Sequence, residues 1–242
     1  MNGRRKLFVA LTLKFLLAGA AMGQQPASPE EALRQVEDTL RQAQRGIQQF
    51  RESGGKPEDP NHPVLKWADA LWQYRLRYPG TAAAAKGTTE SIHLLVHAER
   101  FQQVRERADS LEAGDRAWET LAGVLLEAAT LRKDFGPFIE RMEALLLRGG
   151  DAQVRAALHY QLGRARWQQG EHEKAGVAFQ AAQQDAPGSQ WAKEAESSLY
   201  ELTRLSPGQA APTFSAQARD GKPVTQAGFR GRAVVLVFWS TT

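Results

Sequence analysis

Cysteine is missing from all 242 residues of this chain. Without it, the chain as it stands can form no disulfide, offer no thiolate nucleophile and carry no lipid anchor on a cysteine after a leader. The sequence also has no glycine-rich phosphate-binding loop, no Gly-x-Ser-x-Gly motif and no repeated Cys/His metal spacing. We therefore expect neither a cofactor nor a metal, and no catalytic residue within the chain.

Outside its N-terminal segment, the chain also has no excess of positive charge. The formal net charge is +4, from 31 basic and 27 acidic residues. Four of the basic residues, Arg4, Arg5, Lys6 and Lys14, precede Gln24 in a stretch without acids, so the remainder is formally neutral. A neutral remainder lacks the basic footprint that binds nucleic acid or anionic membranes, and we expect no nucleic-acid partner.

Residues 1–23 have the three parts of a secretory signal peptide. A basic start precedes an apolar stretch over residues 7–20, which Lys14 interrupts and which is short for a membrane span. Ala21-Met22-Gly23 then supplies a small-x-small cleavage pattern before Gln24. We expect cleavage there, export to the periplasm or envelope, and no membrane span in the mature chain. The alternative is an uncleaved N-terminal anchor.

Long amphipathic helices are predicted for the body of the chain. Ser28, Pro29 and Glu31 have the pattern of a capped helix start, and that helix extends to about Glu52. A linker with Gly and Pro separates it from a second helix over residues 64–78. The second helix carries an aromatic stripe on one face, which we expect to pack into a core. The stripe consists of Trp67, Leu71, Tyr74 and Tyr78.

The last predicted helix pair has a diagnostic spacing of small residues. Its pattern residues are Leu162, Gly163, Ala175, Phe179, Ala182 and Pro187. This spacing resembles the tetratricopeptide (TPR) repeat, in which small residues let two helices cross closely while a large aromatic fills the gap. The resemblance implies a TPR-like array of antiparallel helix pairs over residues 24–204, each stacked on its neighbours. Such an array is expected to bind a protein partner.

Two groups of polar residues in the helical body are considered as possible functional sites. His93 and His97 lie four residues apart on one helix face, as in zinc peptidases, but Leu94-Leu95-Val96 between them supplies no glutamate base. We therefore favour ordinary surface or core histidines over a metal site. A second group consists of the basic residues Arg100, Arg105 and Arg107, which alternate with acidic residues. This alternation is typical of a helix face exposed to solvent, and we expect that location for them.

The final 38 residues, 205–242, differ from the helical body. A β-branched apolar run after Gly231 ends in Phe238-Trp239 and predicts a buried strand. The motif positions of this segment are Gly208, Ala211, Pro212, Phe214, Asp220, Gly221, Lys222, Gly231, Phe238 and Trp239. They resemble the redoxin family, above all its TlpA-like thiol-disulfide oxidoreductases. That family's pattern is Gly, Ala-Pro-x-Phe, an Asp-Gly-Lys turn, Arg-Gly-Lys, a Val-rich strand and Phe-Trp-Ala-Thr-Trp-Cys-x-x-Cys. The chain departs from it at Gln226-Ala227 and at Thr242.

The resemblance implies a thioredoxin-like domain of which residues 205–242 form the first part. In the family, the first cysteine of the pair attacks a protein disulfide as a thiolate and the second resolves the mixed disulfide. The first would follow directly after Thr242, so we expect the chain to be a fragment whose coding sequence continues with Cys-x-x-Cys. Phe238 and Trp239 would pack beside that site.

Two alternatives to the oxidoreductase stay open. One is a non-enzymatic TPR-like envelope interaction protein, with a redoxin remnant that never had cysteines. The other is a peroxiredoxin-like peroxidase, which ranks lower because Ser240 stands where that branch usually has Pro. The expected fold class is mainly α: a TPR-like array of antiparallel helical hairpins, followed by the first strands of an incomplete α/β thioredoxin-like domain.

Overall fold

The computed structural model describes residues 28–237 apart from 57–58 and 60. Over these residues the chain is mainly helical, as the sequence predicts, with one two-stranded sheet. The predicted signal peptide, Phe238 and Trp239 lie outside the described residues. Among the described helices, none combines the length and the apolar character that crossing a membrane requires.

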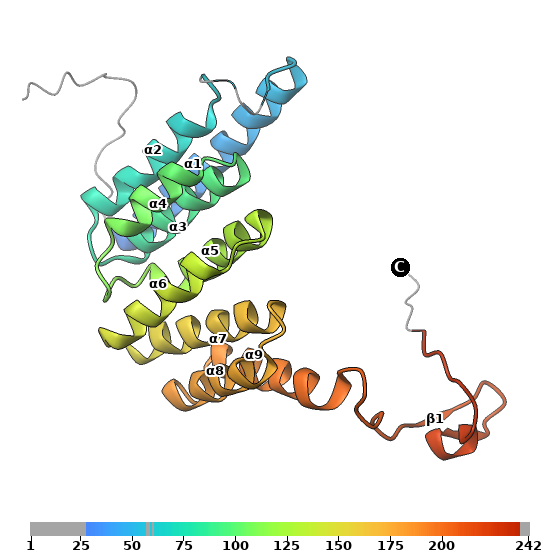
Figure 1. Cartoon of the computed structure of the whole chain (residues 1–242). Coiled ribbons are helices and arrows are strands. Elements are labelled where there is room, and N and C mark those ends of the chain that lie inside the picture. Colours follow the sequence, from blue (N-terminus) through green and yellow to red (C-terminus); the bar gives the residue numbers. More distant parts are fainter. Residues whose placement is uncertain (1–27, 57–58, 60, 238–242) are drawn as a thin grey trace, which may run out of the picture.

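The helical elements follow one another with short connections (Figure 1). In chain order they are α1 (Pro29–Glu52), α2 (Val64–Arg77), α3 (Ala82–His97), α4 (Phe101–Asp109), α5 (Trp118–Arg132), α6 (Gly136–Leu147), α7 (Ala152–Gln168), α8 (His172–Asp185), α9 (Gln190–Tyr200) and the π-helical turn η1 (Glu201–Leu205). After them come β1 (Ser215–Gln217), β2 (Pro223–Thr225) and the 3₁₀ turn η2 (Gln226–Phe229).

The first helix begins where its capping pattern predicts. The Ser28 hydroxyl accepts a hydrogen bond from the Glu31 backbone N–H at 3.1 Å, and Pro29 occupies the first turn, where its missing N–H costs nothing. Ala32, Val36 and Ala43 are buried along one face, so α1 packs one stripe against α2 and α3.

One turn geometry occurs twice, between α2 and α3 and between α8 and α9. Both turns have the sequence x-Pro-Gly-Ser/Thr, with glycines at positive φ: Gly80 at 76° and Gly188 at 78°. The next residue then caps the following helix. Thr81 accepts a hydrogen bond from the backbone N–H of the third residue beyond it at 3.2 Å, and Ser189 does so at 3.1 Å. The repeated sequence therefore corresponds to a repeated structure.

Helices that are close in sequence pack together and form a stack (Figure 1). α3 contacts α2, α4 and α5, whereas α7 contacts α5, α6, α8 and α9. The central core lies around Trp118, Leu121 and Met142, which are at most 1% exposed. A second cluster surrounds Phe179 between α7, α8 and α9. Because each helix buries its apolar face against near neighbours, the body grows along one direction.

The prediction of a solvated basic face on α4 is wrong for Arg107. Its guanidinium points inward and donates to the Ala68 carbonyl oxygen at 2.8 Å, and also to Ser91 and Asp69. The same guanidinium lies 5.2 Å from the centre of the Trp72 ring. The alternation of charge along α4 indicates an amphipathic helix. It does not show which basic side chain turns inward to bind polar groups of the neighbouring helices.

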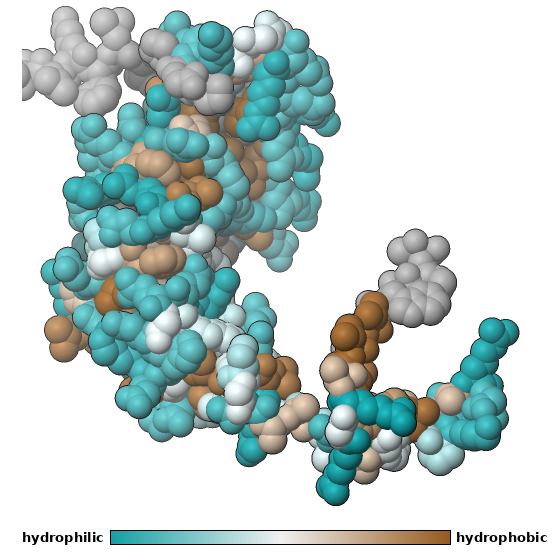
Figure 2. Space-filling view, turned by 45° about the vertical axis from the view of Figure 1, so that its right-hand side comes forward, coloured by the Kyte–Doolittle hydropathy of each residue, from teal (hydrophilic) through white to brown (hydrophobic). Residues whose placement is uncertain are grey.

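The predicted strand after Gly231 is not formed over residues 233–237. These residues are extended without ladder partners, and Val235 and Val237 are 85% and 74% exposed. A buried strand needs neighbours on both edges and cover on both faces. The described part of the chain offers only β1 and β2, which pair with each other, so the apolar run stays open (Figure 2).

Candidate functional site

Within the described residues, the redoxin-like motif positions lie on and around a β-hairpin. β1 and β2 pair antiparallel, with Ser215 opposite Thr225 and Gln217 opposite Pro223. The Asp220-Gly221 pair forms the turn between the strands, where Gly221 has a φ of +81° that favours glycine. The Asp220 carboxylate accepts from the Lys222 backbone N–H at 3.2 Å. The hydrogen bonds from Lys222 also lower the pKa of the Asp220 carboxyl.

The segment before the hairpin folds back onto the turn that follows it. The Gln226 side chain donates to the Ala211 carbonyl oxygen at 3.1 Å, and its backbone N–H donates to the Phe214 carbonyl oxygen at 3.3 Å. The rings of Phe214 and Phe229 lie 6.5 Å apart between centroids. Gln226 is one of the positions where the chain departs from the family pattern, and here it holds the Ala-Pro-x-Phe segment in place.

Four of the six TPR-like residues come together between α7 and α8, and Leu162 and Pro187 lie elsewhere. Phe179 is fully buried, and a Cβ built on Gly163 would lie only 2.6 Å from its ring. The flanking Ala175 and Ala182 are fully buried in the same cluster. Leu162 instead faces the central core, and Pro187 lies exposed in the turn after α8.

Two further aromatics complete the packing around Phe179. The Tyr160 ring lies 6.0 Å from it, and the Trp167 ring meets it edge-on at 6.2 Å. The Tyr160 and Trp167 rings pack on either side of the Phe179 ring.

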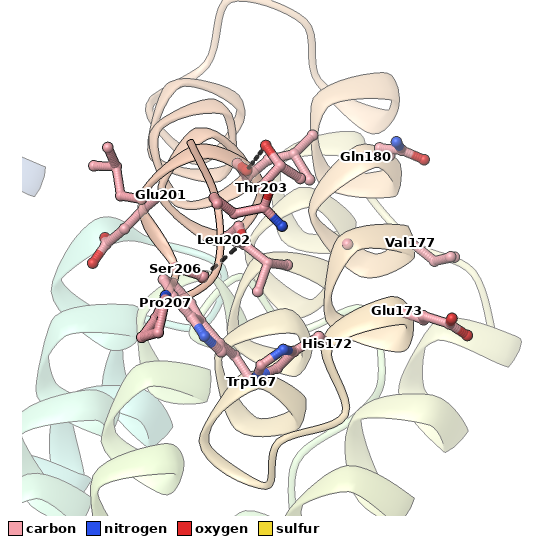
Figure 3. A pocket seen from close by; sticks show the side chains of 14 residues that line it. Trp167, His172, Glu173, Val177, Gln180, Glu201, Leu202, Thr203, Ser206 and Pro207 are labelled. Atoms are coloured by element: carbon pink, nitrogen blue, oxygen red, sulfur yellow. Dashed lines mark hydrogen bonds between the residues drawn. The ribbon is translucent and has the colours of Figure 1, made fainter. Parts of the chain in front are cut away.

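A groove with a volume of about 920 Å³ lies between α8 and η1. Figure 3 shows Trp167 and His172 at one end of it, near Leu202 and Pro207, while Glu173, Val177 and Gln180 follow one another along α8. Val177 and Leu205 are 67% and 52% exposed. The sequence gives no sign of this groove, which forms between the exposed face of α8 and η1, the direct continuation of α9.

The two histidines of α3 are joined by a carboxylate from α5. The Nε2 atoms of His93 and His97 lie 2.9 Å apart, and the Oε2 atom of Glu127 lies 3.5 Å from the Nε2 atom of His93. The Oε1 atom of Glu127 lies 3.7 Å from the Nδ1 atom of His97. The other nitrogen of His93 lies 3.6 Å from a Glu90 carboxylate oxygen. Hydrogen bonding to Glu90, together with the charges of Glu90 and Glu127, raises the pKa of His93 against the opposing effect of burial.

Sequence reasoning missed Glu127 in this group. The three residues between the histidines include no carboxylate. The third side chain comes from a helix separated by α4 in sequence, and no spacing rule within α3 could indicate it. The mostly apolar sequence of α5 contains two acidic residues, Glu119 and Glu127, and the sequence alone does not show which of them faces the histidines.

No family model, curated protein or solved structure matches this chain.

Proposed function

We propose that this chain joins a TPR-like partner-binding domain to the N-terminal part of a TlpA-like thiol-disulfide oxidoreductase domain. The observation that carries the proposal is the arrangement of residues 205–237. In this segment Asp220-Gly221 forms the turn of the hairpin, and the Ala-Pro-x-Phe segment contacts Gln226 just after the second strand. The Val-rich run follows these elements in the chain. That order supports the redoxin resemblance better than any single motif residue does.

The exposed apolar run supports the same proposal. Four successive residues, Val234, Val235, Leu236 and Val237, are each at least 45% exposed. In Figure 2 they form the apolar column next to the grey terminal residues. Such a run is a liability in water unless it pairs with further strands, as the central strand of a thioredoxin-like sheet does.

The chemistry of the complete domain would require two cysteines beyond Thr242. The first thiolate would attack one sulfur of a protein disulfide and form a mixed disulfide, with the other substrate sulfur leaving as a thiolate. The second cysteine would then attack the mixed disulfide, so that the substrate becomes a dithiol and the enzyme pair a disulfide. A helix N-terminus at the first cysteine would lower its pKa.

The deciding experiment is to read the coding sequence after Thr242. We expect Cys, two further residues and a second Cys, followed by about 100 residues that complete a domain of ordinary size. A lone Cys would favour the peroxidase, and a stop codon would contradict the oxidoreductase. Serine at either cysteine of the complete protein should abolish reduction of a disulfide-bonded protein substrate.

The interaction-only alternative has its own supporting observation, the groove between α8 and η1. Its exposed apolar residues could contact an apolar segment of a partner. A photo-crosslinking residue at Val177, compared with one at the exposed Glu52 on α1, tests this. A discrete adduct at position 177 alone supports a partner at the groove, and equal labelling at both positions contradicts it.

A further inference from the structure

A three-ligand cluster bridges two helices near the middle of the stack. His93 and His97 project from the last two turns of α3, and Glu127 projects from α5. One ligand atom from each residue lies within 4.8 Å of the other two. We propose that His93, His97 and Glu127 bind a divalent transition-metal ion of the zinc type, which clamps α3 to α5.

The distances fit tetrahedral coordination. Zinc–nitrogen and zinc–oxygen bonds of about 2.0–2.1 Å put two tetrahedral ligand atoms about 3.3 Å apart. The two histidine Nε2 atoms are 2.9 Å apart, and the nearer oxygen of Glu127 is 3.5 Å from the Nε2 atom of His93. Side-chain adjustments of a few tenths of an ångström would bring these two pairs to the required spacing, and the third pair, Glu127 with His97, approaches within 3.7 Å through the Nδ1 atom of His97.

The ligands stand on rigid supports. On α3, Ile92, Leu95 and Val96 are fully buried next to the two histidines, and Leu126 is buried next to Glu127 on α5. A hydrogen bond of 2.8 Å between Thr89 and Thr120 also joins the two helices. Packing therefore fixes the backbone positions from which the ligands extend, and the metal would not have to order them.

Glu90 supplies the supporting carboxylate that metal-bound histidines commonly have. Its oxygen lies 3.6 Å from the Nδ1 atom of His93, the nitrogen that remains when Nε2 binds the ion. A carboxylate there holds the proton on Nδ1 and orients the ring. The sequence would therefore supply both a ligand and its support within one turn of α3.

The site faces solvent and has a free coordination position. The side chains of His93, His97 and Glu127 are 37%, 54% and 39% exposed. Three protein ligands and water make up the coordination typical of an open zinc site. Imidazole with carboxylate also suits zinc-type ions, whereas Mg²⁺ and Ca²⁺ take oxygen ligands.

The test uses the whole chain, stripped of metal with a chelator. Zn²⁺ should raise its Tm in a concentration-dependent way because the ion binds only the folded chain, and Mg²⁺ should not. Co²⁺ should give the intense visible absorption of a tetrahedral site. A parent chain with neither the Zn²⁺-dependent shift nor the Co²⁺ bands overturns the proposal and leaves two hydrogen-bonded imidazoles.

Variants locate the site. His93→Asn, His97→Asn and Glu127→Gln should each abolish the Co²⁺ bands and most of the Zn²⁺-dependent shift, with circular dichroism used to check that each variant folds. His172→Asn, at an exposed histidine of α8, is the matched control and should behave as the parent. Glu90→Gln keeps all three ligands and should weaken Zn²⁺ binding about 10- to 100-fold. Retention of the full shift in the three ligand variants would place the ion elsewhere and overturn the proposal.

Discussion

Gly163 is the residue whose role follows most directly from its size. A Cβ at this position would meet the Phe179 ring at 2.6 Å, and that ring is fully buried between Tyr160 and Trp167. Gly163→Ala gains about 1 kcal/mol of helix propensity but forces the ring or the helices apart, at a cost of about 1–3 kcal/mol. We expect net destabilisation, measured by urea unfolding.

A glycine on the facing helix gives the matched control. At Gly176 an added Cβ would meet its nearest atom, on Leu199, at 3.7 Å, which is an ordinary contact. Gly176→Ala should therefore stabilise the chain by up to about 1 kcal/mol. Adding Phe179→Leu to Gly163→Ala should cost less than Phe179→Leu costs alone, because the smaller side chain relieves the clash. Strict additivity would contradict this account.

His62 should make stability fall in mild acid. It is 6% exposed, accepts a hydrogen bond from the Val64 N–H at 3.1 Å and meets the Phe50 ring edge-on. Burial, and then the charges of Arg100 and Arg51, lower the pKa of His62 in the folded state. The unfolded chain therefore takes up the proton first, and the contribution of neutral His62 is lost as pH falls below about 6.5 and through its folded pKa.

His62→Asn separates this effect from that of His93, whose raised pKa has the opposite sign. Asparagine keeps an acceptor for the N–H two residues on, but it does not titrate. Unfolding free energy measured between pH 7.5 and pH 5.5 should fall less steeply for this variant than for the parent. Parallel curves would mean that His62 is not held neutral.

At the scale of an element, the docking of α4 depends on Arg107. This side chain is 15% exposed and binds the Ala68 carbonyl oxygen, Ser91 and Asp69, while its guanidinium lies over Trp72. Hydrogen bonds to charged groups are worth about 1.5–3 kcal/mol each when one partner is removed. Arg107→Ala should lower the free energy of unfolding by about 2 kcal/mol, measured with denaturant.

The same helix carries the control for this prediction. Arg105 is exposed, so Arg105→Ala should change stability by no more than about 0.5 kcal/mol. Arg107→Lys should recover part of the loss, because an ammonium can replace one hydrogen bond but not the planar stacking over Trp72. Equal effects at positions 105 and 107 would contradict the inward orientation of Arg107.

Some features of the fold are determined by residues close together in the sequence, and these features can be predicted from the sequence alone. The bounds of α1 depend on capping residues that act over three or four positions, so the sequence predicts them. The partnership of Glu127 with His93 depends on how α3 and α5 pack. Helical periodicity shows which face is apolar but not which polar residue of another helix meets it.

For the whole molecule, we expect the residues from α1 to η1 to account for nearly all of the free energy of unfolding. Leu202 of η1 is 7% exposed and belongs to the cluster around Phe179. Beyond Ser206, the described residues are largely exposed and pair only as a short hairpin, which is marginal alone. Removing residues 207–242 should leave helical circular dichroism and Tm nearly unchanged.

Two further measurements make this whole-molecule prediction specific. Removing residues 201–242 also deletes Leu202, and should lower the Tm because a buried leucine contributes about 2–5 kcal/mol. Removing residues 207–242 should improve solubility, since it eliminates the exposed run at Val234–Val237, an unpaired apolar segment that favours association between chains. Light scattering of the full chain and of both truncations at matched concentration measures this. A large drop in Tm on removal of residues 207–242 alone would show that the redoxin-like segment is docked on the helices and supports them.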